Sequence, residues 1–504
     1  MAPKIPSGSA DLQLADVARR DRHRLFWCWH LYAGLFVAPF QLMLAVTGAI
    51  YPFNDALNDA IHPQLRHTPA PWKERASLGR MIDAAQAHVA GSTARRIDVP
   101  SDPQRPAQVY LDVAKGPSQI AFVDPGSARV LGTLTPSRTL VGLADRRHGS
   151  LMLGTPGCYL IELAACWAVL LILSGLYLGW PRGQGHAWWH DLVATVRAKG
   201  RAFWKSLHAA TGRWICLLVL FLIFAGLPWA TFWGAWVHSG AEMIDAGYPA
   251  VYRRYVAPAA PTVGTEFNDV PWTLQHAPMP PAATGSDPAH AHHLPHSAAT
   301  PGAARDWTDA GLERAIAHIR AAGTADPLRV LLPSTQRGAL MAYTSPDQPQ
   351  GQVTYHFDQQ GALLVRAGFD DDGAVAQASE MGVQLHMGNY VGRANQLAML
   401  FACVGIVVLC ASGMVMWCGG ASRPAASARP ERATTRRIAG YSPWPPQPPS
   451  RSHCCSFHFL WSGRSTAGSG RDHRCSDGST DTRRCLHRPI AGHSGSLAPN
   501  LLEQ

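Results

Sequence analysis

The sequence predicts a polytopic α-helical membrane protein, in which a four-helix transmembrane bundle carries two α+β modules outside the membrane. Three observations predict this class. Four long runs are almost free of charge, Trp and Tyr gather at their ends, and the same histidine and glycine spacings occur twice. Charged residues make up 15% of the 504 residues, whereas about a quarter is typical of soluble proteins.

Each apolar run is close to the roughly 20 residues that cross the hydrocarbon core of a bilayer. The expected spans are Leu31–Phe53, Tyr159–Trp180, Trp214–Val237 and Gln396–Trp417. Aromatic side chains at both ends suit the headgroup level of the membrane. The first run is too long for the apolar region of a cleavable signal peptide, so we expect it to remain as a signal anchor.

Lys and Arg set the expected orientation. They gather before the first span, between the second and third, and after the fourth. Because basic loops stay in the cytoplasm, the pattern predicts a multi-pass protein of the bacterial inner membrane with both large polar segments in the periplasm. The net charge of +10 then reflects these loops. No basic stripe is interleaved with aromatics, so nucleic acid is not an expected partner.

The expected chain organisation alternates spans with polar segments. In order, the segments are a cytoplasmic N-terminus (1–24), transmembrane helix 1 (25–53), a periplasmic module (54–147), transmembrane helix 2 (148–180), a basic cytoplasmic loop (181–206), transmembrane helix 3 (207–238), a second periplasmic module (239–385) with a His-rich insertion (276–296), transmembrane helix 4 (386–418), and a tail (419–504) that is disordered or translated out of frame.

An internal repeat is the strongest pattern in the sequence. The spacing His-x3-Gly-x13-Gly starts at His30 and again at His208, at the openings of the first and third spans. The spacing His-x5-Gly-x20-Gly starts at His148 and again at His386, just before the second and fourth spans. A serine precedes the last glycine of the second motif both times. Four histidines in two matched sets are unlike a chance arrangement.

The two large polar segments also match. A helix is expected at Leu78–Val89 in the first and at Leu312–Ala322 in the second. Each is followed by strands and a turn in which Asp precedes glycine, within Gln119–Val130 and Val353–Val365. Neither segment contains cysteine, so no disulfide framework is expected, and no CxxC motif suggests a zinc or iron–sulfur site.

Depth in the membrane pairs the histidines. His30 and His208 lie at the cytoplasmic ends of their spans, and His148 and His386 lie on the periplasmic side. A bis-imidazole iron needs two histidines at one depth on facing helices, and the sequence supplies one such pair at each face. A glycine four residues after His30 and His208 leaves room for a macrocycle. Two haems would give electrons a route across the bilayer.

Several polar residues have plainer interpretations. Any one of the four histidines could cap a helix or bond a neighbour instead of a metal. His23 could substitute as a ligand, although a solvated role suits it better, and His238 suits an interfacial role better than ligation. Glu162 is expected to pair with a helix neighbour, the alternative being proton movement. The five histidines of 276–296 could bind metal or belong to a disordered insertion.

Four stretches carry a family resemblance. They are HLYAGLFVAPFQLMLAVTGAIYPF (30–53), RHGSLMLGTPGCYLIELAACWAVLLILSGLYLGWPRG (147–183), LHAATGRW…AGLPWATFWG (207–234) and LHMGNYVGRANQLAMLF (385–401). Over about residues 20–420 the chain resembles the PepSY-associated transmembrane family, which includes iron-regulated membrane proteins and haem-containing ferrisiderophore reductases. The resemblance implies two periplasmic PepSY-like domains, a role in iron uptake, and His30, His208, His148 and His386 as the iron ligands of two haems b.

The expected function is therefore electron transfer to a ferric siderophore or another ferric chelate. No Gly-rich dinucleotide fingerprint follows a strand, so the electron donor would be a separate flavoprotein or quinol. Many relatives have a fifth apolar helix, which is missing here. One alternative is a PepSY-domain binding or regulatory scaffold without redox activity. A transporter is disfavoured, because the spans contain one acid and no base.

Overall fold

A computed structural model describes residues 8–180, 198–256, 261–267, 270–281, 307–324, 327–333 and 338–421. Below, residues 8–180 are the first half and residues 198–421 the second half. The predictions for most of the basic loop, for the His-rich insertion beyond residue 281 and for the tail beyond residue 421 lie outside the described residues.

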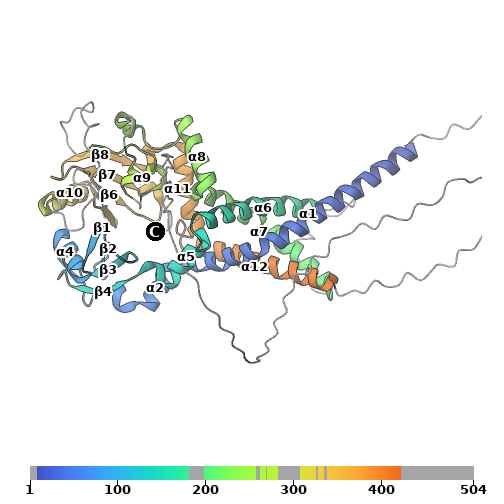
Figure 1. The fold of residues 1–504 in the computed structure, drawn as a ribbon, viewed down its shortest axis with the longest axis horizontal. Coiled ribbons are helices and arrows are strands. Elements are labelled where there is room, and N and C mark those ends of the chain that lie inside the picture. The colour runs from blue at the N-terminus through green and yellow to red at the C-terminus, as the bar shows by residue number, and fades with distance from the viewer. Residues whose placement is uncertain are drawn as a thin grey trace, which may run out of the picture. The chain divides into compact units, whose positions relative to one another are not determined.

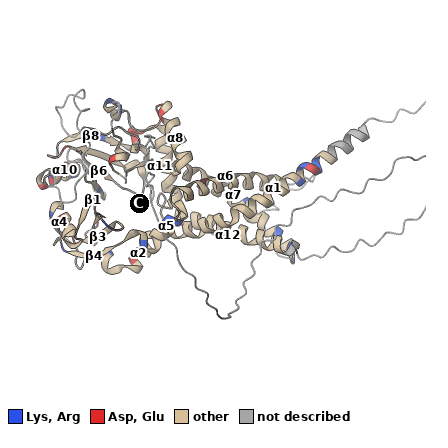
Figure 2. Cartoon of the chain, in the orientation of Figure 1, with Lys and Arg blue, Asp and Glu red and all other residues tan. Residues whose placement is uncertain are grey.

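Four described helices are long and apolar enough to cross a membrane: α1 (Gly8–Ile50), α6 (Thr155–Gly179), α7 (Arg201–Gly226) and α12 (Arg393–Ala421). Figure 2 shows few charged residues along α6 and α12. Inside, α12 packs on α1 and α7 around Ala45, Ile215 and Ile406. Large apolar side chains such as Leu217, 76% exposed, point outward. The chain is a multi-pass membrane protein.

The third membrane helix ends earlier than the sequence predicts. The prediction placed this span at Trp214–Val237, but α7 stops at Gly226. A turn, η4 (Leu227–Trp229), follows, and α8 (Thr231–Met243) then begins in a new segment. Pro228 explains the break, because proline lacks the N–H that continues a helix. A hydropathy profile does not reveal this break, because the sequence stays apolar across it.

Glu162, the one acid in the predicted spans, pairs with a helix as expected. Its carboxylate accepts hydrogen bonds from the backbone N–H groups of Phe232 and Trp233, at 2.9 and 3.0 Å. These amides belong to the first turn of α8 and have no partner within that helix. The Glu162 carboxylate on α6 thus caps α8. The N-terminal end of the α8 dipole is positive and favours this negative charge.

Two short helices stand before the second and fourth membrane helices. They are α5 (Leu140–Ser150) and α11 (Ala374–Met387), and each ends in a residue with left-handed backbone. Leu151 has a φ of 54° and Gly388 a φ of 86°. The turns after them separate α5 from α6 and α11 from α12, so His148 and His386 lie on helices of their own.

The strands of both polar segments form one antiparallel sheet in the described part of the chain, in the order β4-β3-β2-β1-β5-β6-β7-β8 (Figure 1). The central pair is β1–β5, in which Ile97 lies opposite Val330. The strands are β1 (Ser92–Val99), β2 (Ala107–Val113), β3 (Gln119–Val123), β4 (Val130–Leu134), β5 (Leu328–Leu331), β6 (Leu340–Thr344), β7 (Val353–Phe357) and β8 (Leu363–Gly368).

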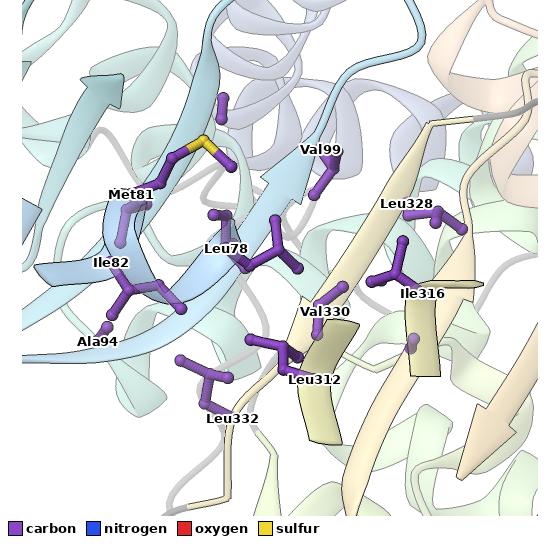
Figure 3. Close-up of a cluster of buried hydrophobic side chains, with 14 of the residues drawn as sticks. Leu78, Met81, Ile82, Ala94, Val99, Leu312, Ile316, Leu328, Val330 and Leu332 are labelled. Carbon is purple, nitrogen blue, oxygen red and sulfur yellow. The ribbon is translucent and has the colours of Figure 1, made fainter. Parts of the chain in front are cut away.

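Both predicted helices and both predicted hairpins are confirmed. The helices are α4 (Leu78–His88) and α10 (Asp309–Ala321), and the hairpins are β3–β4 and β7–β8. Figure 3 shows Leu78 and Ile82 of α4 beside Leu312 and Ile316 of α10, against strand residues such as Val330. One core therefore serves both polar segments. Their division into two domains and the internal repeat stay predictions.

A second cluster of buried apolar residues includes Tyr252, Phe267, Met341 and Tyr343. It joins strands of the second half to the segments η5 (Ala250–Tyr255), α9 (Val263–Glu266) and η6 (Trp272–Leu274). The remaining short elements are η1 (Tyr51–Phe53), α2 (Asn54–Ile61), α3 (Pro63–Arg66), η2 (Pro136–Arg138), η8 (Pro349–Gly351) and η9 (Phe369–Asp371).

Candidate functional site

The structure brings the four predicted histidines together as two facing pairs. The rings of His30 on α1 and His208 on α7 have centroids 6.2 Å apart and planes at 86°. The rings of His148 on α5 and His386 on α11 have centroids 6.4 Å apart and planes at 89°. We call these the 30/208 pair and the 148/386 pair. Each joins one helix of the first half to one of the second.

A glycine on a neighbouring helix lies against every one of these rings. A Cβ built at Gly175 would be 3.1 Å from Cε1 of His30, and one at Gly48 would be 3.3 Å from Cε1 of His148. In the second half, a Cβ built at Gly226 would be 3.5 Å from Cε1 of His386, and one at Gly413 would be 3.6 Å from Cε1 of His208. These glycines close the two sequence motifs, so the motif spacing places each ring against bare backbone.

The residue before the glycine holds the ring of three of the histidines. Nδ1 of His30 lies 2.9 Å from Oγ of Ser174, and Nδ1 of His208 lies 3.0 Å from Oγ of Ser412. Nδ1 of His148 lies 2.9 Å from Oγ1 of Thr47. All three hydroxyls are largely buried. The sequence motif that starts at His148 and His386 included the two serines. Thr47 belongs to the other motif, whose second copy has Ala225 at that position, so no repeated residue pointed to it.

The hydroxyls also fix which ring nitrogen carries the proton. Ser174 donates its own proton to the carbonyl of Leu170 at 2.6 Å, and Ser412 donates to that of Val408 at 2.6 Å. Thr47 donates to the carbonyl of Met43 at 2.9 Å. Each oxygen is then left to accept, so Nδ1–H of the ring must donate. Nε2 keeps its lone pair, and this is the tautomer that binds a metal through Nε2.

His386 differs from the other three. Ala225 precedes Gly226, so no hydroxyl stands where Thr47 and the serines stand in the other positions. Nδ1 of His386 is buried without a hydrogen bond among the described residues. The carbonyl of Leu222, one turn before Gly226, faces the ring but at a geometry too poor for a full hydrogen bond.

The ring separations suit a metal between two imidazoles. An imidazole nitrogen binds a transition metal at about 2 Å, and the ring centre lies about 1 Å further back, so two rings on opposite sides of one ion have centroids about 6 Å apart. The observed 6.2 and 6.4 Å agree with this value. Two facing imidazoles are a fitting donor set for haem iron, and three of the four rings are held through the second nitrogen.

The other polar residues of the sequence analysis lie outside the two pairs. His23 is exposed on α1. His238 is buried and stacks on Trp272 and His276, with centroids 3.8 and 4.1 Å away. Of the five histidines in the 276–296 tract, the structure describes His276 alone.

Two carboxyls that bond Thr273 were not singled out in the sequence analysis: Glu380, which is buried on α11, and Asp372, which is half-buried just before α11. Glu380 on α11 accepts from the N–H of Thr273 at 3.4 Å, and Asp372 accepts from the hydroxyl of Thr273 at 2.7 Å. Burial raises the pKa of each carboxyl to about 7. Nothing in a sequence distinguishes such a carboxyl from a solvated one, because burial depends on the tertiary packing.

The family comparison covers the part of the chain that contains the site. The model of the PepSY-associated TM region matches residues 27–419, a range that contains all four histidines and all four glycines. The chain belongs to this family. No curated protein matches the sequence of this PepSY-associated protein.

Proposed function

We propose that this PepSY-associated protein is an electron carrier of the bacterial inner membrane that holds two haems b and reduces chelated ferric iron, such as a ferric siderophore, in the periplasm. The observation that carries the proposal is the pair of matched histidine sites, each with ring centroids at a bis-imidazole separation. A binding or regulatory scaffold has no need for such pairs.

The residues fit the cofactor at both sites. His30 and His208 would hold one haem, and His148 and His386 the other. A bound haem supplies a one-electron iron couple and leaves the protein to set its position and potential. Gly48, Gly175, Gly226 and Gly413 let each ring lie close to a neighbouring helix, and three hydroxyls steady the rings.

Two features support an outward direction of electron flow. Basic residues favour a cytoplasmic location for the start of α1 and for the segment before α7, which places the 30/208 pair toward the cytoplasm. His148 and His386 follow the two polar segments in the chain and lie on the short helices α5 and α11. The ferric chelate would then receive its electron on the side of the 148/386 pair. The donor is a separate flavoprotein or quinol.

The matched spacings also support an origin from one repeated unit of span, polar segment and span. The two polar segments then correspond to two PepSY-like domains, each built from one helix and four strands, and they join edge to edge through β1 and β5. In this arrangement each haem site takes one histidine from each repeat, so neither repeat alone holds a complete site.

Reoxidation of the reduced protein tests the proposed reaction. The purified chain is reduced with limiting dithionite, mixed with a ferric siderophore, and followed by haem absorption and by a ferrous-iron indicator. We expect reoxidation with one ferrous ion formed for each electron lost. A metal-free siderophore is the control and should not reoxidise the haem. Haem that stays reduced with every ferric chelate would end the reductase proposal and favour the scaffold alternative.

A further inference from the structure

A second cluster of ligand-type side chains lies on α8, outside the four apolar helices. His238 and Glu242 are four residues apart on this helix, so they share a face. His276, which follows η6, donates from Nδ1–H to Oε1 of Glu242 at 2.9 Å. One ligand atom from each of the three residues lies within 4.8 Å of the other two.

His238 is built into this cluster rather than lying loosely on the surface. Its side chain is only 7% exposed, and its ring stacks on Trp272 and on His276. Trp272 is itself fixed, because it is buried and donates from Nε1 to the carbonyl of Pro228 at 2.9 Å. The position of His238 is therefore set by packing on a rigid indole.

The ring nitrogen Nε2 of His238 is buried and has no hydrogen-bond partner in the described part of the chain. A buried polar atom left without a partner destabilises the folded state. A buried imidazole nitrogen without a partner, beside two other ligand-type atoms, is suited to bind a metal.

We propose that His238, Glu242 and His276 bind a divalent transition-metal cation. Two imidazoles and one carboxylate are a donor set that suits Zn²⁺ and Fe²⁺ and leaves a position open for water. Because Zn–N bonds are about 2 Å long, the three ligand atoms must draw together slightly from their present separations. Glu242 and His276 can do so, since their side chains are 39% and 44% exposed.

The site belongs to the second half alone. His238 lies twelve residues after Gly226, and Glu242 lies sixteen after it; the residues at the same distances from Gly48 are Ala60 and Gln64. The corresponding helix in the first half, α2 (Asn54–Ile61), ends before the second of these positions. The metal site is thus independent of the four histidines, and it neither requires nor excludes haem there.

Zinc binding to the purified full-length chain tests the proposal. Isothermal titration calorimetry in detergent should give one tight Zn²⁺ site per chain. His276→Ala and Glu242→Gln each remove or weaken one ligand at an exposed position, and we expect the affinity to fall at least about tenfold. His67→Ala is the matched control, because His67 is an exposed histidine away from the cluster, and it should leave the affinity unchanged.

A second variant separates this cluster from the remaining histidines of the tract. Replacing His290, His292, His293 and His296 together with alanine should preserve the tight site. His238→Gln is the deeper test, with circular dichroism to confirm folding. The proposal is overturned if no stoichiometric Zn²⁺ binds, if His276→Ala and Glu242→Gln bind as well as wild type, or if binding disappears with the tract variant.

Discussion

The two histidine pairs have nearly the same ring geometry but different surroundings. In the 30/208 pair both Nδ1–H groups donate to serine hydroxyls. In the 148/386 pair Thr47 serves His148, while Ala225 leaves His386 without such a partner. A hydrogen bond from Nδ1–H makes the ring a more basic ligand, and a more basic ligand favours ferric iron. We therefore expect a haem held by the 148/386 pair to have a higher reduction potential than one held by the 30/208 pair.

This difference gives the proposed electron path a direction. Electrons move toward the higher potential, so they would pass from the 30/208 pair to the 148/386 pair, and the lysine and arginine distribution independently predicts that direction. Ala225, which has no hydroxyl, would then be the residue that separates the potentials of the two sites.

Removing one ligand should empty one site and spare the other. His148→Ala or His386→Ala should lower the haem content from two per chain to one, and the remaining haem should show the lower potential. His30→Ala or His208→Ala should leave the haem with the higher potential. The measurement is a pyridine haemochrome assay with redox titration, and His67→Ala is the control. Loss of both haems, or of neither, from every single variant would contradict the pairing.

Glu162→Gln should destabilise the protein without emptying either site. The variant keeps one acceptor oxygen but loses the charge that caps α8, and a charge-assisted hydrogen bond contributes about 1.5–3 kcal/mol. We expect a lower midpoint in thermal unfolding followed by circular dichroism, with two haems retained. An unchanged midpoint would mean that water replaces the carboxylate at the amides of Phe232 and Trp233.

Glu380→Gln should change how stability depends on pH. Burial raises the folded pKa of Glu380 from 4.5 to about 7, so the folded state favours the protonated carboxyl. Its contribution to stability is full below about pH 4.5 and is lost as the pH rises through 7, by about 1 kcal/mol between pH 6 and pH 8. The glutamine variant should lose less stability over this interval when thermal unfolding is measured at both values. An equal loss in wild type and variant would show that Glu380 does not titrate there.

Ala225→Ser should make the two pairs more alike. The new hydroxyl could accept from Nδ1–H of His386, as Thr47 does from His148, and there is space because a Cβ at Gly382 would lie 3.6 Å from that of Ala225. A net hydrogen bond of about 0.5–1 kcal/mol corresponds to a fall on the order of 20–40 mV in the reduction potential of the haem held by the 148/386 pair. Ser412→Ala removes the hydroxyl that bonds His208, so it should raise the reduction potential of the haem held by the 30/208 pair. A rise with Ala225→Ser would reverse our account of the asymmetry.

The sequence predicted the spans, the hairpins and the pairing of the histidines, because these depend on hydropathy, on turn residues and on depth along a helix. It placed the end of the third helix wrongly, since Pro228 breaks a run that stays apolar. It did not predict that β1 and β5 join the two polar segments, because pairing of strands more than 200 residues apart leaves no local signal. The contact of Thr47 with His148, and the lack of a hydroxyl partner for Nδ1 of His386, became visible only once the helices were packed.

Haem stoichiometry tests whether the two histidine pairs each hold a haem. Absorption spectra of detergent-purified protein, oxidised and dithionite-reduced, are recorded together with a pyridine haemochrome assay. We expect sharp reduced α and β bands and two haems b per chain. Folded protein from cells supplied with haem that shows no such bands would contradict this expectation, and the histidine pairs would then be structural contacts of a binding scaffold.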